Sequence, residues 1–299
     1  MSLIGKLGLG TVQFGVDYGV SNKNGKVAGA SVNEILKRAQ SCGITTLDTS
    51  PAYGTAEDSL GKSQNINNSF DIVTKTLRVE GDSISDQDIL NIESIFFKSL
   101  KKMNASSIYG LLAHNGLDLC KVGYQKYFDL FERLKSDGLV KKTGASVYNK
   151  LELESILKCG HLDIIQIPLN IFDQEMICNG YLDELKAGGV EIHVRSTFLQ
   201  GLLLMPPSSI NPYFAPIKNK LARYHKLLKE HQLTALEACL AFSLSHDCVD
   251  KVIIGITNDL ELEEIVSAAA TAATISLPDF SNYSMSDSQF SNPSKWKLI

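Results

Sequence analysis

Short apolar runs alternate along this chain with longer stretches in which apolar residues recur every three or four positions. The short runs predict strands, and the longer stretches predict amphipathic helices. Eight runs fit strands: KLGLGTV (6–12), ITTLD (44–48), FDIVTKT (70–76), SIYGLLAH (107–114), VKKTGASV (140–147), LDIIQIP (162–168), VEIHVRS (190–196) and KVIIGIT (251–257). A predicted helix separates nearly all of them, which is the pattern of repeated βα units.

Local signals place several helix ends. Three capping residues are each followed three positions later by an acid, as at helix starts: Ser31 with Glu34, Asn149 with Glu152, and Thr234 with Glu237. Four glycines stand where helices are expected to end: Gly43, Gly138, Gly160 and Gly189.

Eight βα units within 299 residues predict an α/β fold, a (β/α)₈ barrel formed as a single domain over residues 1–299. The tail, residues 278–299, is a candidate to lie over the barrel rim. A doubly wound sheet would instead need a glycine-rich phosphate turn after the first strand. GLGTVQFG (8–15) has Gln13 at the third glycine position and runs into a polar loop, so we interpret it as a strand exit.

Composition excludes several classes of function. The formal net charge of −4 argues against a nucleic-acid-binding surface, which is usually basic. No apolar run reaches the roughly 18 residues of a membrane span. The six cysteines lack C-x-x-C spacing and nearby histidine pairs, which indicates reduced thiols in a cytoplasmic protein and no metal site.

Four polar residues occupy one rim of the predicted barrel. Asp48, Lys75 and His114 lie at the carboxyl ends of the second, third and fourth strands, and Tyr53 lies in the loop after the second. Active sites of such barrels lie at this rim. Each residue alone has an ordinary structural explanation, but the set suits protonation of an oxyanion: a lysine can lower the pKa of a phenol, and an acid can hold the lysine. Hydride for the carbon would have to come from a nicotinamide.

The sequence resembles the aldo-keto reductase family. The resemblance rests on LGLGTVQFG, LDTSPAYGTAEDSLG, IVTKT, LLAH, TGASVYN, IIQIPLN, FLQGLL and VIIGITNDLELEEI, in the family's order over roughly residues 6 to 270. It implies a (β/α)₈ barrel that uses NADPH or NADH to reduce a small-molecule carbonyl substrate. It also implies Tyr53 as the proton donor, Lys75 and Asp48 as residues that tune it, and His114 as the residue that orients the carbonyl.

The resemblance further implies a cofactor site. Ser146 and Gln166 match positions that hold the nicotinamide carboxamide. The other matching positions lie at the first strand exit, in the loop that wraps the pyrophosphate and around the adenosine: Gly10, Thr11, Asp48, Arg195, Ser196, Phe198, Gln200, Gly201, Gly255, Thr257, Asn258, Leu262 and Glu264.

Departures from the family pattern bear on the choice of cofactor. Arg195 replaces an aromatic residue that stacks on the nicotinamide, Val147 and Ile265 replace asparagines, and Glu261 stands where relatives often carry a basic residue. No arginine or lysine follows between 252 and 270. A 2′-phosphate needs cations or several donors, so we expect NADH to bind at least comparably to NADPH.

Two other functions stay open from the sequence. One is a non-catalytic, nicotinamide-sensing regulatory subunit with the same fold. The other is an unrelated barrel lyase or hydrolase, which would need a metal or a pair of carboxylates. The sequence shows neither the identity of the carbonyl substrate nor the oligomeric state.

Overall fold

A closed parallel barrel forms the centre of the computed structural model, which describes residues 3–63, 66–178, 180–285 and 287–298. Its strands follow one another in chain order, and the last pairs with the first. They are β1 (Leu7–Gly10), β2 (Thr46–Asp48), β3 (Asp71–Lys75), β4 (Ile108–Ala113), β5 (Val140–Ser146), β6 (Ile164–Pro168), β7 (Glu191–Arg195) and β8 (Lys251–Gly255). The predicted (β/α)₈ barrel is therefore confirmed, and the strands lie within or at the predicted runs.

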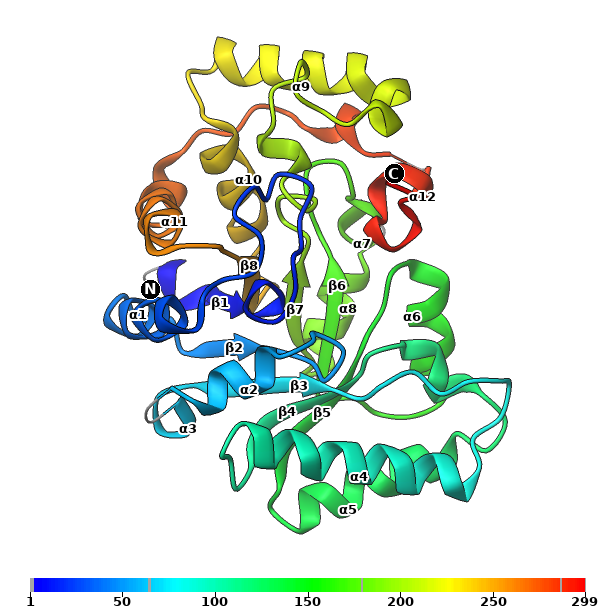
Figure 1. Ribbon diagram of the computed structural model, residues 1–299. Helices are drawn as coiled ribbons and strands as arrows, with labels where there is room; N and C mark the ends of the chain where they lie inside the picture. Colours follow the sequence, from blue (N-terminus) through cyan, green and yellow to red (C-terminus); the bar gives the residue numbers. More distant parts are fainter. Residues whose placement is uncertain (1–2, 64–65, 179, 286, 299) are drawn as a thin grey trace.

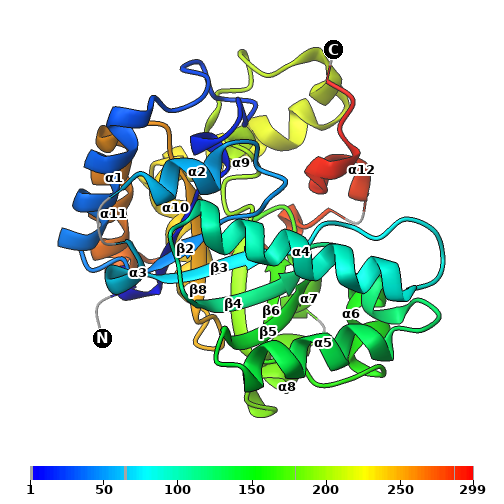
Figure 2. The same cartoon turned by 60° about the horizontal axis from the view of Figure 1, so that its bottom comes forward.

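Helices surround the barrel, as Figures 1 and 2 show from two directions. The α-helices of the described residues are α1 (Gly29–Ser41), α2 (Ala56–Gly61), α3 (Ile66–Ser69), α4 (Asp86–Lys102), α5 (Gln125–Ser136), α6 (Lys150–Leu157), α7 (Glu175–Cys178), α8 (Tyr181–Ala187), α9 (Lys218–Glu230), α10 (Ala235–Leu244), α11 (Asp259–Thr271) and α12 (Ser288–Ser291). Their buried faces and the outer faces of the strands form one large apolar core.

Two of the three predicted helix starts are confirmed. Thr234 and Asn149 cap α10 and α6 through hydrogen bonds from the backbone N–H three residues later. The prediction for Ser31 is wrong, because α1 begins at Gly29 after Ala28. The residue before that cap, Val27, is held by a backbone hydrogen bond to Gln13 (2.9 Å), so the helix starts as the chain leaves this contact.

Three of the four predicted terminal glycines are confirmed as left-handed residues after helices: Gly43 (φ +86°), Gly138 (φ +71°) and Gly189 (φ +79°). The prediction for Gly160 is wrong, because α6 already ends at Leu157. A Cβ at Gly160 would lie 2.5 Å from the Phe128 ring. Close packing, and not a helix end, therefore requires glycine there.

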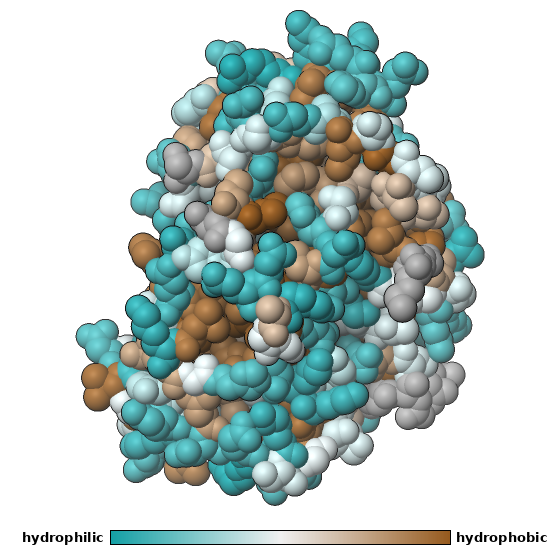
Figure 3. Space-filling model, turned by 180° about the vertical axis from the view of Figure 1, so that it is seen from behind, coloured by the Kyte–Doolittle hydropathy of each residue, from teal (hydrophilic) through white to brown (hydrophobic). Residues whose placement is uncertain are grey.

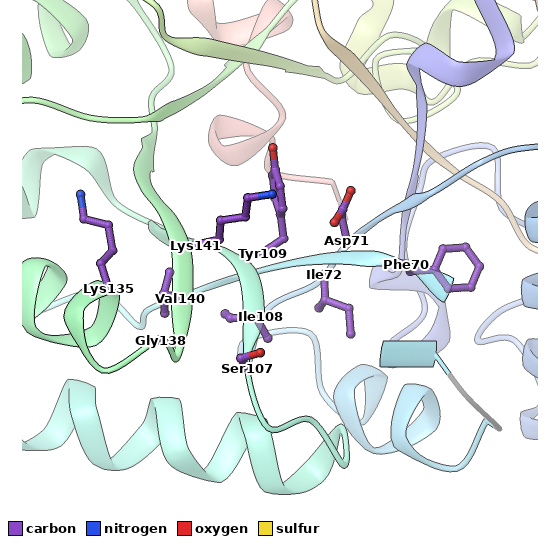
Figure 4. A pocket seen from close by; sticks show the side chains of 10 residues that line it. All are labelled: Phe70, Asp71, Ile72, Ser107, Ile108, Tyr109, Lys135, Gly138, Val140 and Lys141. Atoms are coloured by element: carbon purple, nitrogen blue, oxygen red, sulfur yellow. The ribbon is translucent and has the colours of Figure 1, made fainter. Parts of the chain in front are cut away.

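The amino ends of the strands form a polar floor in the barrel. Glu191 accepts hydrogen bonds from the Tyr109 hydroxyl (2.6 Å) and from Lys142 Nζ (2.5 Å), and its other oxygen lies 2.7 Å from His193 Nε2. A cavity of 540 Å³ opens beside this cluster at the start of β3, β4 and β5. Figure 4 shows Lys141 extending beside Tyr109 there. This end of a barrel serves stability, while chemistry belongs to the carboxyl end.

The tail contacts the carboxyl-end loop that follows β6. Met285 N donates to Phe172 O (2.9 Å) in that loop. The Trp296 ring packs edge-on against Phe214, in the segment that follows β7, with centroids 4.8 Å apart. The assignment of residues 1–299 to a single domain stays a prediction.

The surface shows separate apolar patches between hydrophilic side chains on the face drawn in Figure 3. Among the described residues, no helix combines the length and apolar character that crossing a bilayer requires. In that same part of the chain, no three His, Cys, Asp or Glu residues gather into a possible metal site. All six cysteines are free, although the sulfurs of Cys120 and Cys159 lie 3.6 Å apart.

Candidate active site

The carboxyl ends of β2, β3 and β4 bring the four predicted catalytic residues together. Asp48 ends β2, Lys75 ends β3, and His114 directly follows β4. Parallel pairing sets Asp48 opposite Val73, and Lys75 opposite Leu112. Neighbouring strands therefore deliver their last side chains to the same rim.

A buried ion pair anchors this rim. Lys75 Nζ donates to Asp48 Oδ1 (2.7 Å) and to the carbonyl of Thr49 (2.9 Å). The two side chains are 1% and 6% exposed. The second carboxylate oxygen of Asp48 accepts a hydrogen bond from Gln166 Nε2 (2.7 Å). Both oxygens of the acid are therefore paired, as a buried carboxylate requires.

Tyr53 lies against the lysine. Lys75 Nζ is 5.0 Å from the centre of the Tyr53 ring. Burial raises the pKa of Tyr53 above its ordinary value of 10, and Lys75 lowers it only in part. The expected lowering of the Tyr53 pKa by Lys75 is thus outweighed by the effect of burial. The phenol is protonated at neutral pH and has a proton to give.

His114 completes the cluster as a neutral ring. Its imidazole meets the Tyr53 ring edge-on, with centroids 5.8 Å apart, and its Nδ1 lies 3.2 Å from Ser50 Oγ. Burial, with a smaller contribution from the Lys75 charge, lowers the pKa of His114 to about 3. The ring can therefore donate one hydrogen bond at neutral pH without carrying charge.

Two glycines hold the loop that carries Tyr53. A Cβ at Gly15 would lie 1.6 Å from the carbonyl oxygen of Tyr53, so the loop after β1 touches this backbone directly. Gly54 has φ +57° and packs against Gly15 and Val16. Glycine is required at both positions, by contact at Gly15 and by contact and conformation at Gly54.

The expected carboxamide residues lie next to this cluster on β5 and β6. Gln166 is 1% exposed, and its Oε1 has no hydrogen-bond partner among the residues that the structure describes. Ser146 Oγ is 3.4 Å from Arg195 Nε. The Arg195 guanidinium also donates to the carbonyl of Val147 (3.1 Å) and lies 4.3 Å from the centre of the Tyr148 ring.

The loop after β7 has an unusual backbone. Ser196 and Gln200 adopt left-handed conformations (φ +61° and +54°), as does Gly201 (φ +89°). The chain between β1 and α1, dark blue in Figure 1, fastens this loop: Gln200 O accepts from Val20 N (3.1 Å), and Gln200 Nε2 donates to the Tyr18 hydroxyl (2.9 Å). Phe198 packs partly buried against the core.

The expected adenosine residues lie around the start of α11. Asn258 caps this helix by accepting from Glu261 N (2.9 Å). The Glu261 carboxylate accepts from both the backbone N–H and the hydroxyl of Thr257, at 2.7 Å each. Leu262 is fully buried in the apolar core, and Glu264 is exposed.

The remaining expected cofactor residues, Gly10, Thr11 and Gly255, lie at the carboxyl ends of β1 and β8. Thr11 is buried, and its hydroxyl donates to the carbonyl of Asp48 (3.1 Å). Gly10 lies against Ile253, and Gly255 lies under the side chain of Gln13, 2.6 Å from where a Cβ would stand.

Sequence reasoning missed several residues here. Ser50 stands two positions after Asp48 and contacts His114 across 64 residues of chain. Within the described part of the chain, Thr197 and Gln13 each hold a buried oxygen without a hydrogen-bond partner. Asp173, in the loop after β6, has its pKa raised to about 7 by burial and by Glu175. Only Ser50 had a local signal, the Ser-Pro-Ala turn in which Ala52 N donates to its hydroxyl (3.1 Å).

The chain is similar to known proteins over most of its length. A model of the aldo/keto reductase family matches residues 6–278. The chain is 22% identical over 302 residues to a protein of Escherichia coli (strain K12) named NADH-specific methylglyoxal reductase, covering 89% of this chain and 90% of the relative. It is 24% identical over 282 residues to the uncharacterized oxidoreductase YqkF of Bacillus subtilis (strain 168), covering 89% and 87%. The solved holo structure of the aldo-keto reductase AKR11C1 from Bacillus halodurans has the same fold, with a TM-score of 0.69, 21% identity, and coverage of 93% and 89%.

Proposed function

Because this chain belongs to the aldo/keto reductase family, we propose that it reduces a small aldehyde or ketone with NADH and that Tyr53 donates the proton. The contact that carries this proposal is the one between the Tyr53 ring and the buried Lys75–Asp48 pair. A protonated phenol beside a fixed positive charge can release its proton as negative charge develops on a carbonyl oxygen.

The residues have distinct roles in this proposal. Lys75 stabilises the phenolate that Tyr53 leaves behind, and the pKa of Lys75 is raised, against the effect of burial, by Asp48 and Tyr53, so it stays charged. Asp48 holds the ammonium in place. His114, neutral and next to Tyr53, donates a hydrogen bond that orients the carbonyl oxygen. A bound nicotinamide supplies the hydride.

The residues present suit a nicotinamide. The unpartnered oxygen of Gln166 is buried and accepts hydrogen bonds only, so the amide N–H₂ of a carboxamide would satisfy it. Ser146 Oγ lies on the neighbouring strand and can donate to the carboxamide oxygen. We place the pyrophosphate at the loop containing Ser196, Phe198, Gln200 and Gly201, and the adenosine at Thr257, Asn258 and Glu264. We leave Leu262 out of the site because its side chain is in the core.

Glu261 is the basis for NADH as the proposed cofactor. Its carboxylate already accepts hydrogen bonds from the Thr257 hydroxyl and backbone N–H. A 2′-phosphate would need these same donors. A carboxylate there repels a phosphate that carries nearly two negative charges but can accept from a ribose hydroxyl. A lysine from another element would be needed to offset this repulsion, but Lys220 on α9 donates to the carbonyl of Ser284 (2.8 Å).

Fluorescence titration of the protein with NADH and NADPH at one stated ionic strength tests the cofactor. We expect NADH to bind at least as tightly as NADPH, and Glu261→Gln to shift the affinity ratio toward NADPH by roughly tenfold, since it removes one charge repulsion. Glu263→Gln, on the same helix, is the matched control. A strong NADPH preference in the unaltered protein would contradict the proposal and direct attention to Lys23, which adjoins the Asn24 that contacts Thr257.

The reaction itself is tested by incubating the protein with NADH and a panel of carbonyl compounds and measuring turnover as the loss of NADH absorbance. The name of the Escherichia coli relative makes a small 2-oxoaldehyde the first compound to try. Turnover of no carbonyl by a protein that binds NADH would contradict the proposed reaction and favour the sensing role instead.

A further inference from the structure

Ser50 is a buried polar residue to which the proposed reaction assigns no role. It is 1% exposed, and its hydroxyl lies 3.2 Å from His114 Nδ1. We propose that Ser50 is a positioning residue that fixes His114 in the tautomer bearing its hydrogen on Nε2. This inference rests on the proposed function, in which His114 donates a hydrogen bond to the carbonyl oxygen.

The hydrogen-bond inventory of Ser50 sets the direction of the contact. A serine hydroxyl has one hydrogen to donate and two lone pairs. The backbone N–H of Ala52 donates to this oxygen at 3.1 Å, so that contact uses a lone pair and leaves the hydrogen free. The other partner that the described residues offer is His114 Nδ1. If Nδ1 carried a hydrogen, the oxygen would accept twice, and its own buried hydrogen would lack an acceptor, which costs free energy.

The charge state of His114 makes the tautomer decisive. A doubly protonated imidazole donates from both nitrogens, whereas a neutral one donates from one only. Burial keeps the His114 ring neutral, and the Lys75 ammonium on the neighbouring strand also opposes a second proton. Its single hydrogen is therefore on Nε2 or on Nδ1, and Ser50 selects between them.

The selection matters for the carbonyl. With Nδ1 engaged by Ser50, Nε2 is the nitrogen left for a substrate. As Nε2–H it donates to a carbonyl oxygen, while in the other tautomer its lone pair would face the lone pairs of that oxygen. Holding the tautomer in advance removes a reorganisation from the reaction step.

Nitrogen NMR of the protein labelled with ¹⁵N-histidine reads the tautomer directly, without turnover or cofactor. Comparison with His114→Gln identifies the His114 signals among those of the six histidines. At neutral pH we expect a pyridine-like Nδ1 and a pyrrole-like Nε2 in the unaltered protein. In Ser50→Ala we expect the two signals to move toward one another or exchange. Ser155→Ala is the control and should leave them unchanged, because Ser155 is a partly buried serine on α6 whose hydroxyl donates to Leu151 O (2.8 Å) in its own helix.

A pyrrole-like Nδ1 in the unaltered protein, or an unchanged tautomer in Ser50→Ala, would overturn the inference. The spectrum of the unaltered protein decides it even if Ser50→Ala fails to fold, and Ser50→Thr, which keeps a hydroxyl, should restore the original signals. Turnover is read separately: we expect kcat to fall about tenfold in Ser50→Ala, the scale of one lost hydrogen bond, and to recover in Ser50→Thr. A changed tautomer with unchanged kcat would keep Ser50 as the residue that sets the tautomer but contradict the role of His114 in the proposed function.

Discussion

The pair formed by Lys75 and Asp48 shows how few residues define this site. Each charge is buried and satisfied mainly by the other. A buried pair of this kind adds little net stability, because desolvation offsets the attraction, but removing one partner strands the other. Each charge is therefore tolerated only in the presence of the other, and a single remaining charge would lower the free energy of unfolding.

Lys75→Met should lower the free energy of unfolding by about 3–5 kcal/mol, the usual effect of leaving one charge of a buried pair alone. Adding Asp48→Asn should return part of that loss, because the stranded charge is gone, while turnover stays low. Urea unfolding of the two variants measures this. Equal stability of Lys75→Met and the unaltered protein would show that the pair is not buried as described.

At the scale of elements, the site depends on the packing of the loop after β1 against the loop after β2. Gly15 in the first touches the Tyr53 carbonyl in the second with no room for a side chain. Both glycines, Gly15 and Gly54, lie within the motifs that carry the family resemblance. We infer that these motifs encode loop contact as well as chemistry.

Gly15→Ala should destabilise the protein by about 1–3 kcal/mol, as overpacking does, and should reduce turnover strongly because the Tyr53 backbone has to move. Gly29→Ala is the matched control. Gly29 opens α1, and no neighbouring atom of the described residues lies within 4 Å of its Cβ position, so that variant should be neutral or slightly more stable. Thermal unfolding and NADH oxidation measure both variants, and equal behaviour of the two would refute the steric account.

The site was only partly predictable from sequence. Asp48, Lys75 and His114 follow from the rule that chemistry lies at strand ends, because each adjoins a recognisable apolar run. The contacts of Ser50 and Arg195 could not be predicted, since their partners, His114 and Tyr148, are dozens of residues away in the chain. Their contacts depend on how the loops pack, and no local pattern records that.

For the whole molecule, the alternation of apolar runs was sufficient to predict the barrel. A buried parallel strand needs a continuous apolar run, so the strands could be predicted from the sequence. The polar cluster of the barrel floor could not be predicted in this way. Glu191, Lys142 and Tyr109 come from three strands and read singly as ordinary polar strand residues, yet the closed barrel brings them together.

The floor should make stability depend on pH in the acid range. Burial raises the pKa of Glu191, but hydrogen bonds from His193, Lys142 and Tyr109 outweigh burial and hold this pKa below its ordinary value of 4.5. The stabilisation is therefore fully present above pH 4.5 and is lost as the pH falls below it. Glu191→Gln should lower the free energy of unfolding by about 1–3 kcal/mol at pH 7, and the difference should shrink below pH 4.5. A difference that stays constant with pH would contradict this account of the floor.

Proton donation by Tyr53 is the central claim, and Tyr53→Phe tests it most directly because the change removes only the hydroxyl. Turnover of a carbonyl that the unaltered protein reduces should fall by a factor of about one hundred or more, a typical contribution of a general acid. NADH affinity and the thermal unfolding temperature should stay close to those of the unaltered protein. Full turnover by Tyr53→Phe, with NADH still bound, would show that another group delivers the proton.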